Sequence, residues 1–265
     1  MAPWSSDYRR HVAEPVDAVF RAIADRSYSS AERDWLKRIE KRRAKLIDST
    51  DVIEYVDYGA GSSTSVRTAA EMAEGVKRTQ VVGQLTKVAS KNPKWAGLLL
   101  RLVREFKPKR CIELGAAAGI SGAYQAAALE LNGSGTLTSL EGGGSIAALA
   151  SSTLAAMGLD HRAKVVTGRF QDTLDDTIAA KDVDYAFIDG HHDDHATREY
   201  FNTIVAKMPR PALVLLDDIA WSPGMQSAWQ HVSRLPVVEA SFDLGAVGVC
   251  VIGEAKYPLH LSIDY

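Results

Sequence analysis

Apolar and polar positions follow two different patterns along the chain. In residues 1–105 the apolar residues recur at helical spacing, as in 15–25 and in 30–47, where one stripe carries Trp35, Leu36, Ile39, Leu46 and Ile47. From residue 106 onward, short and nearly continuous apolar runs alternate with helical stretches. This part predicts helices near 120–131, 145–157, 172–180, 194–208 and 224–234, and strands at 110–114, 136–141, 163–167, 183–189 and 212–217.

Strands and helices that alternate in this way are typical of a parallel sheet covered on both faces. Two further runs, 237–243 and 247–252, are separated by three residues only, which is too short for a helical crossover and predicts an antiparallel hairpin. We therefore predict an α/β fold: a doubly wound, Rossmann-like, seven-stranded and mostly parallel sheet with a C-terminal antiparallel hairpin. Residues 1–105 would form a helical N-terminal cap, and residues 106–265 the ligand-binding domain.

Composition narrows the class of protein. Apolar residues make up 46% of the 265 residues, which is enough for a large core and excludes intrinsic disorder. The net charge of −2 indicates neither nucleic acid nor an anionic membrane as a partner. Cys111 and Cys250 lie in apolar runs, as buried residues of a protein in a reducing compartment would. Without a signal peptide or a spanning apolar run, we expect a cytoplasmic protein.

A basic stretch stands out in the N-terminal part. Residues 26–45 contain eight basic and three acidic side chains. One interpretation is a docking face for an acidic partner or substrate. The other is a solvated helix face with pairs such as Asp34 and Arg38, four residues apart.

Two glycine-rich turns, 57–61 and 113–121, follow apolar runs, and such turns expose the backbone N–H groups of the next segment to a ligand. Only the second is followed by a helix and then a strand that ends in an acidic residue, Glu141. A carboxylate at that position is placed to accept hydrogen bonds from ribose hydroxyls. The stretch after Gly61 predicts a polar helix and no second strand. We therefore assign a nucleoside site to 113–121 and interpret 57–61 as a structural turn or lid segment.

The spacing within the second loop indicates which nucleoside binds. Gly115 and Gly119 are spaced G-x-x-x-G, and Ala117 stands where the dinucleotide motif G-x-G-x-x-G has its second glycine. The sequence E-x-G-x-x-x-G resembles the first motif of class I S-adenosylmethionine-dependent methyltransferases, whose seven-stranded sheet also ends in an antiparallel hairpin. The resemblance implies S-adenosylmethionine as the cofactor, bound by residues 106–265. Its contacts would include Glu113, Gly115, Ala116, Gly119, Ser121 and Glu141.

A closer resemblance covers residues 85–252. The segment 168–172 resembles the adenine-contacting loop of catechol O-methyltransferase-like enzymes, which implies cofactor contacts by Gly168, Phe170 and Gln171, with Gln171 facing the adenine. Metal-dependent small-molecule O-methyltransferases place carboxylates at the ends of the fourth and fifth strands. Here those positions hold Asp189, Asp217 and Asp218.

Three converging carboxylates repel one another unless a cation or protons neutralise them, and oxygen ligands suit Mg²⁺ or Mn²⁺. We therefore expect a metal site formed by Asp189, Asp217 and Asp218. The alternative is that one residue of the Asp217–Asp218 pair caps the following turn, while Asp189 hydrogen-bonds the cofactor.

The histidines after the fourth strand provide candidate bases. The catechol enzymes have a lysine three residues after the strand-four aspartate, whereas this chain has His192, as macrolide-sugar O-methyltransferases do. A histidine is well suited to remove a hydroxyl proton near neutral pH. We expect catalytic roles for His192, for Asp189 beside it, and next for His191. The alternatives are ordinary loop residues, or a zinc cluster that includes His195, which the absence of thiolates disfavours.

These expectations together describe a methyltransferase that methylates a hydroxyl of a small molecule or natural-product intermediate. The first alternative is a metal-independent N- or O-methyltransferase of the same fold. Others are a nicotinamide-dependent oxidoreductase and a non-catalytic nucleoside-binding protein. The resemblance also implies a homodimer paired through the N-terminal helices, with residues 1–105 selecting the substrate.

Overall fold

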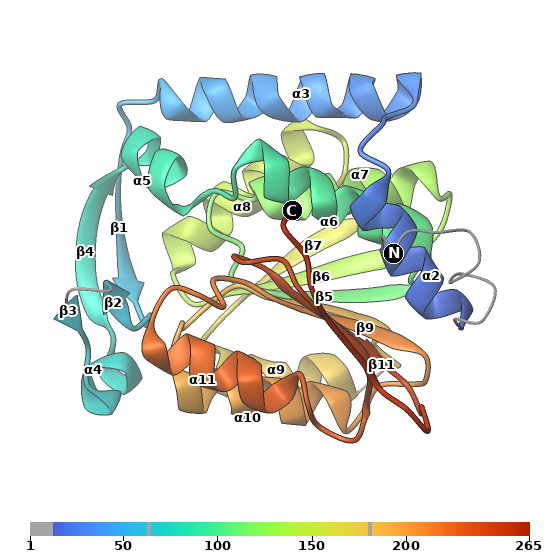
Figure 1. The fold of residues 1–265 in the computed structure, drawn as a ribbon. Helices are drawn as coiled ribbons and strands as arrows, with labels where there is room; N and C mark the ends of the chain where they lie inside the picture. The colour runs from blue at the N-terminus through green and yellow to red at the C-terminus, as the bar shows by residue number, and fades with distance from the viewer. Residues whose placement is uncertain (1–12, 63–64, 180–181) are drawn as a thin grey trace.

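The computed structural model describes residues 13–62, 65–179 and 182–265. Residues 1–12, on which part of the signal-peptide prediction rests, lie outside them. The described residues form three layers, with helices above and below one central sheet, and an arm projects from one side (Figure 1). The prediction of an α/β Rossmann-like fold is confirmed.

The central sheet has eight strands in the order β12-β10-β11-β9-β8-β5-β6-β7. The parallel strands are β5 (Arg110–Leu114), β6 (Thr136–Glu141), β7 (Ala163–Thr167), β8 (Tyr185–Ile188) and β9 (Ala212–Leu216). The predicted hairpin is formed by β10 (Val238–Asp243) and β11 (Gly248–Ile252), and β11 is also antiparallel to β9.

The sequence predicts seven strands, and the eighth is β12 (Leu259–Ser262), which pairs in parallel with β10 at the sheet edge. It has four residues, alternately half-buried and exposed, so it lacks the continuous apolar run of the inner strands.

Helices cover both faces of the sheet. One layer contains α6 (Pro93–Phe106), α7 (Ile120–Leu131) and α8 (Gly144–Ala156), and the other contains α9 (Phe170–Ala179), α10 (Asp194–Val205) and α11 (Pro223–Val232) (Figure 1). Each layer has its own buried apolar cluster against the sheet. The arrangement brings the loops after β5, β6, β8 and β9 to one edge of the molecule.

The N-terminal helices belong to the same core. Helix α2 (Glu14–Ala24) lies against α6, and α3 (Ser30–Ile47) lies against α7 and α5 (Val82–Ala89). The Phe20 ring meets the fully buried Phe242 ring of β10 edge to face, with centroids 5.0 Å apart. Part of the basic stretch binds the protein itself, since Arg38 donates to the Met157 carbonyl at 2.9 Å and Arg42 to Ser152 Oγ at 3.1 Å.

The prediction that residues 1–105 are mostly helical misses the strands within 52–81. Strands β1 (Val52–Asp57) and β4 (Val76–Val81) pair antiparallel as an arm, between which lie β2 (Gly61–Ser62), β3 (Ser65–Val66) and α4 (Ala69–Glu74). The polar helix expected after Gly61 is α4, but contrary to the prediction a strand, β4, follows it. The sequence of β4, VKRTQV, is mostly exposed and polar, so it has no apolar face to reveal a strand.

Two further expectations concern residue chemistry. Cys111 and Cys250 are both free and buried, as predicted. Within the described ranges, no helix combines the length and the apolar character that a membrane span requires.

The contact between Phe20 and Phe242 predicts that the N-terminal helices and the sheet unfold together. Replacing Phe242 by Ala removes a fully buried ring and should lower the free energy of unfolding by about 3–5 kcal/mol. In urea titrations followed by circular dichroism and tryptophan fluorescence, both signals should shift together. Tyr257→Ala is the matched control because that side chain is 80% exposed. Two separate transitions, with only one moved by the substitution, would contradict the shared core.

Candidate functional site

A cavity of about 630 Å³ lies at the carboxyl ends of the parallel strands. Its walls come from the loop after β5, the arm segment 56–61 and the connection between α5 and α6. Most residues of the predicted site line it, namely Gly115, Ala116, Ser121, Glu141, Phe170, Gln171, Asp189, His191, His192, Asp217 and Asp218. Glu113, Gly119 and Gly168 do not line this cavity.

The loop after β5 needs both of its glycines. Gly115 has φ +100°, and a Cβ there would lie 2.1 Å from the carbonyl oxygen of Asp189. Gly119 has φ +78°, and its Cβ would lie 2.9 Å from the Ala150 backbone. Ala117 adopts the left-handed region as well, with φ 45°. The two glycines therefore allow the loop to pack against the residue that follows β8 and against the middle of α8.

Glu141, at the end of β6, is fixed by the backbone around it. Its Oε2 accepts a hydrogen bond from the Ala117 N–H at 3.1 Å, and its Oε1 accepts one from the Gly143 N–H at 2.9 Å. Burial raises the pKa of the Glu141 carboxyl above its ordinary value, against the opposing effect of these N–H donors. Each oxygen retains acceptor capacity for a ribose hydroxyl.

Glu113 lies behind the loop, in the core. Its Oε1 accepts from Gln125 Nε2 at 2.7 Å and its Oε2 from Ser139 Oγ at 2.5 Å. Burial raises the pKa of Glu113 to about 7. The carboxyl therefore supports the loop from within and is positioned away from the cavity that the resemblance assigned to it.

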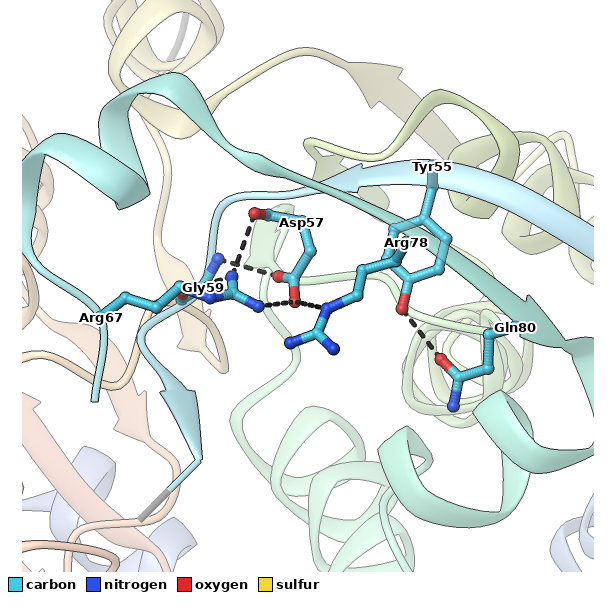
Figure 2. A network of polar contacts seen from close by, with 6 residues as sticks. All are labelled: Tyr55, Asp57, Gly59, Arg67, Arg78 and Gln80. Atoms are coloured by element: carbon cyan, nitrogen blue, oxygen red, sulfur yellow. Dashed lines mark hydrogen bonds and ion pairs between the residues drawn. The ribbon is translucent and has the colours of Figure 1, made fainter. Parts of the chain in front are cut away.

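The arm forms a wall of the cavity through the 57–61 turn. Figure 2 shows how Arg67 fixes this turn: it donates to Asp57 Oδ2 at 2.7 Å and to the Gly59 carbonyl at 2.8 Å, while Arg78 lies 3.7 Å from the same carboxylate. The Ala60 N–H donates to the His191 carbonyl at 2.9 Å. The turn is thus tied to the loop after β8.

Tyr58 of the same turn covers Gly142, next to Glu141. A Cβ on Gly142 would lie 2.7 Å from the Tyr58 ring. On the other side of the cavity, the Phe170 ring packs edge to face on Tyr200 and His191, with centroids 5.7 and 6.2 Å away. Aromatic rings therefore lie at two places around the cavity, Tyr58 beside Glu141 and Phe170 beside His191, and such rings suit a flat heterocycle.

Another part of the cavity wall contains the aspartates that follow β8 and β9 and two of the histidines after β8. His192 Nε2 lies 3.9 Å from Asp189 Oδ1, and its Nδ1 lies 3.9 Å from Asp218 Oδ2. The Trp221 ring lies beside the His192 ring, with the two centroids 5.6 Å apart. His192 thus lies between two carboxylates at the cavity wall, where a base could be oriented.

The other two histidines are placed differently. His191 Nδ1 shares a hydrogen bond of 2.7 Å with the Tyr200 hydroxyl, and burial lowers the pKa of its imidazole. His195 is 81% exposed, with its Nδ1 3.4 Å from Glu199 Oε2, and lies outside the cavity. Of the three, His192 is therefore the best placed to take a proton.

Lys91 is a site residue that the sequence did not reveal. It lies between α5 and α6, and its Nζ forms an ion pair with Asp217 and lies 3.8 Å from Asp189 Oδ2. Nothing in the local sequence distinguishes it from other surface lysines, because its partners are far away in the chain. The indirect signal was the three carboxylates themselves, which require a positive charge from somewhere.

The ammonium of Lys91 changes the interpretation of the predicted metal site. Across residues 13–62, 65–179 and 182–265, no group of three or more His, Cys, Asp or Glu side chains is arranged to hold a metal ion. Asp217 already pairs with a cation, so Asp189, Asp217 and Asp218 do not fit a divalent ion as they lie. The expected Mg²⁺ or Mn²⁺ site stays a prediction, which this arrangement does not support.

Comparison with known proteins agrees with the geometry. Residues 112–219 match a family described as a methyltransferase domain. No curated protein sequence matches the chain. The prediction of a class I methyltransferase is confirmed by this domain together with the fold.

Solved structures share the fold. The O-methyltransferase TomG from Streptomyces achromogenes, in complex with SAM, is 23% identical, with a TM-score of 0.54 over 62% of this chain and 82% of that one. The O-methyltransferase from Bacillus cereus, in complex with SAH, is 16% identical, with a TM-score of 0.57 over 90% and 97%. SAH-bound PaMTH1 from Podospora anserina is 12% identical, with a TM-score of 0.57 over 96% and 99%.

The raised pKa of Glu113 predicts a pH-dependent stability. Its pKa is about 7 in the folded protein against an ordinary 4.5, so folding takes up a proton between these values. The contribution of Glu113 to the free energy of unfolding is fully present below pH 4.5 and is lost as the pH rises to about 7. Glu113→Gln does not titrate, so its stability relative to wild type should increase over this window by about 3 kcal/mol. Urea titrations of both proteins from pH 5 to pH 8 measure the difference, and a constant difference would contradict the buried acid.

Proposed function

We propose that this chain, in which a methyltransferase domain occupies residues 112–219, transfers the methyl group of S-adenosylmethionine to a hydroxyl oxygen of a small molecule. The observation that carries the proposal is that one cavity is lined by two chemically distinct sets of groups. One set consists of Glu141, backbone N–H groups and aromatic rings, as an adenosine requires. The other is His192 between two carboxylates, as deprotonation of an alcohol requires.

The proposed cofactor is supported from two sides. The loop 113–121 and Glu141 are the features that hold a nucleoside in open α/β sheets. The fold neighbours from Streptomyces achromogenes and Bacillus cereus contain SAM and SAH respectively. In this chain, Glu141 would bind the ribose, and Phe170 and Gln171 would flank the adenine. Ser121, at the start of α7, would bind the carboxylate of the methionine part.

The proposed reaction is a single displacement. A lone pair of the acceptor oxygen forms a bond to the methyl carbon while the carbon–sulfur bond breaks, and its electron pair stays on sulfur. His192 takes the hydroxyl proton and passes it to solvent. The products are the methyl ether, S-adenosylhomocysteine and a proton. Because the sulfonium methyl is already activated, alignment in the cavity supplies much of the acceleration, on the order of 7–11 kcal/mol for well-oriented groups.

The acceptor is proposed to be a small molecule, with no role for nucleic acid or a membrane. A cavity of about 630 Å³ that also receives the cofactor leaves room for a compact acceptor. Pairing through the N-terminal helices stays a prediction. The resemblance also implies metal dependence, but the proposed reaction uses no metal ion, because Lys91 already pairs with Asp217.

Binding of S-adenosylhomocysteine is the first expected result. It should raise the melting temperature, by about 5 °C near a hundredfold excess over Kd, whereas NAD should not. Glu141→Ala should weaken binding by tenfold or more in calorimetry, because the ribose loses a charged acceptor. Glu199→Ala, on the exposed face of α10, is the matched control. A shift with NAD alone would support the nicotinamide alternative instead.

Turnover should depend on His192. With the best acceptor from a panel of phenols and sugar hydroxyls, His192→Gln should lower kcat by a factor of about 10²–10⁴ while S-adenosylhomocysteine still binds. His195→Gln, at the 81% exposed position, should leave kcat unchanged. Transfer of labelled methyl measures the rate, and the mass and cleavage pattern of the product distinguish O- from N-methylation. An unchanged kcat in His192→Gln would exclude this residue as the base, and a protein that binds S-adenosylhomocysteine but methylates nothing would favour the non-catalytic alternative.

A further inference from the structure

Asp217 is a buried carboxylate in need of a positive charge. Its side chain is 1% exposed, and neither of its oxygens accepts a hydrogen bond from another group of the described residues. A buried carboxylate without compensation is strongly unfavourable. The Lys91 ammonium is the cation that reaches it.

Lys91 also faces a second carboxylate. Its Nζ lies 3.8 Å from Asp189 Oδ2, and only 13% of its side chain is exposed. Asp189 and Asp217 directly follow the neighbouring parallel strands β8 and β9. The ammonium therefore lies at the junction of the two strand ends, where the predicted divalent ion would have been held.

The backbone of Lys91 is held on regular structure. Helix α5 ends with the Ser90 N–H donating to the Thr86 carbonyl at 3.2 Å. Helix α6 begins after Asn92, whose side chain accepts from the Trp95 N–H at 3.2 Å, with Pro93 in the first turn. Because α6 is anchored in the core, Lys91 projects into the cavity from a fixed point.

We propose that the Lys91 ammonium is the cation of the acceptor site, beside Asp189 and Asp217, so that this methyltransferase works without a divalent metal ion. The inference rests on the proposed function. The ammonium pairs with Asp217 and lies 3.8 Å from Asp189 Oδ2, and it has three N–H donors, one of which would serve the acceptor oxygen. A hydrogen bond from an ammonium stabilises the developing negative charge on that oxygen as His192 removes the proton.

The assignment of Lys91 as the cation also narrows the class of acceptor molecule. A metal ion binds best to two adjacent oxygens of one ligand, whereas an ammonium is a point charge that donates single hydrogen bonds. An acceptor with one isolated hydroxyl therefore meets the requirements of the site, and a vicinal diol gains nothing from its second hydroxyl.

The test compares Mn²⁺ binding by wild type and Lys91→Met, using electron paramagnetic resonance of free Mn²⁺ and the melting temperature. Wild type should not bind Mn²⁺ at concentrations up to about 1 mM. Lys91→Met leaves the carboxylates without a counter-ion, so it should melt at a lower temperature and regain about 5 °C with saturating Mn²⁺. Lys91→Met/Asp217→Asn should lose both effects. Lys91→Arg, which keeps the charge, should exclude Mn²⁺ like wild type.

Lys87→Met, on exposed α5 surface outside the cavity, is the matched control and should behave as wild type. Binding of Mn²⁺ by wild type would overturn the proposal, and this result does not depend on whether a variant folds. Equal changes in melting temperature of wild type and Lys91→Met on addition of Mn²⁺ would overturn it as well. With an acceptor in hand, wild type should keep full turnover in EDTA, and Lys91→Met should lose at least tenfold in kcat. Failure to bind S-adenosylhomocysteine would instead refute the proposed function, which the Mn²⁺ measurement does not depend on.

Discussion

Repulsion between carboxylates at one sheet edge is the constraint around which the site is arranged. Parallel strands bring Glu141, Asp189 and Asp217 to the same edge, with Asp218 next to them. Two parts of the chain offset this repulsion. Backbone N–H groups donate to Glu141, and the Lys91 ammonium pairs with Asp217 and lies 3.8 Å from Asp189 Oδ2. His192 lies between Asp189 and Asp218. These groups lie on three elements, namely the glycine loop, the connection before α6 and the loop after β8.

The inner sheet was predictable because its physical signal is strong. Strands β8 and β9 are buried along their whole length and lie within the predicted ranges, since a strand covered on both faces is a continuous apolar run. Strands β5, β6 and β7 have the predicted bounds. The hairpin followed from the three residues between its strands. The arm and β12 were missed for the opposite reason. The strands of the arm and β12 are short or half-exposed. Backbone hydrogen bonds hold these strands, and such bonds do not require a regular pattern of apolar side chains.

The same distinction applies to the site. Carboxylates at strand ends could be predicted to converge because topology alone brings them together, and His192 follows one of them closely. Lys91 could not be predicted, because its position depends on how α5 and α6 pack against the sheet. Glu113 shows a different limit. The motif E-x-G-x-x-x-G identifies Glu113 as a candidate site residue. Whether its side chain faces the cavity or the core depends on Gln125 and Ser139, which lie outside the motif.

The rigid placement of Glu141 has a consequence for which nucleosides the pocket admits. Both carboxylate oxygens are held by backbone N–H groups, so this side chain cannot turn away from a ligand. It can only accept hydrogen bonds, and a ribose must therefore present free hydroxyls to it. A phosphate on the same ribose would place two anions face to face in a buried position, at a cost that contacts to the base would not recover. With the proposed cofactor, the Glu141 carboxylate would therefore select by charge for a nucleoside with an unphosphorylated ribose over one with a 2′-phosphate.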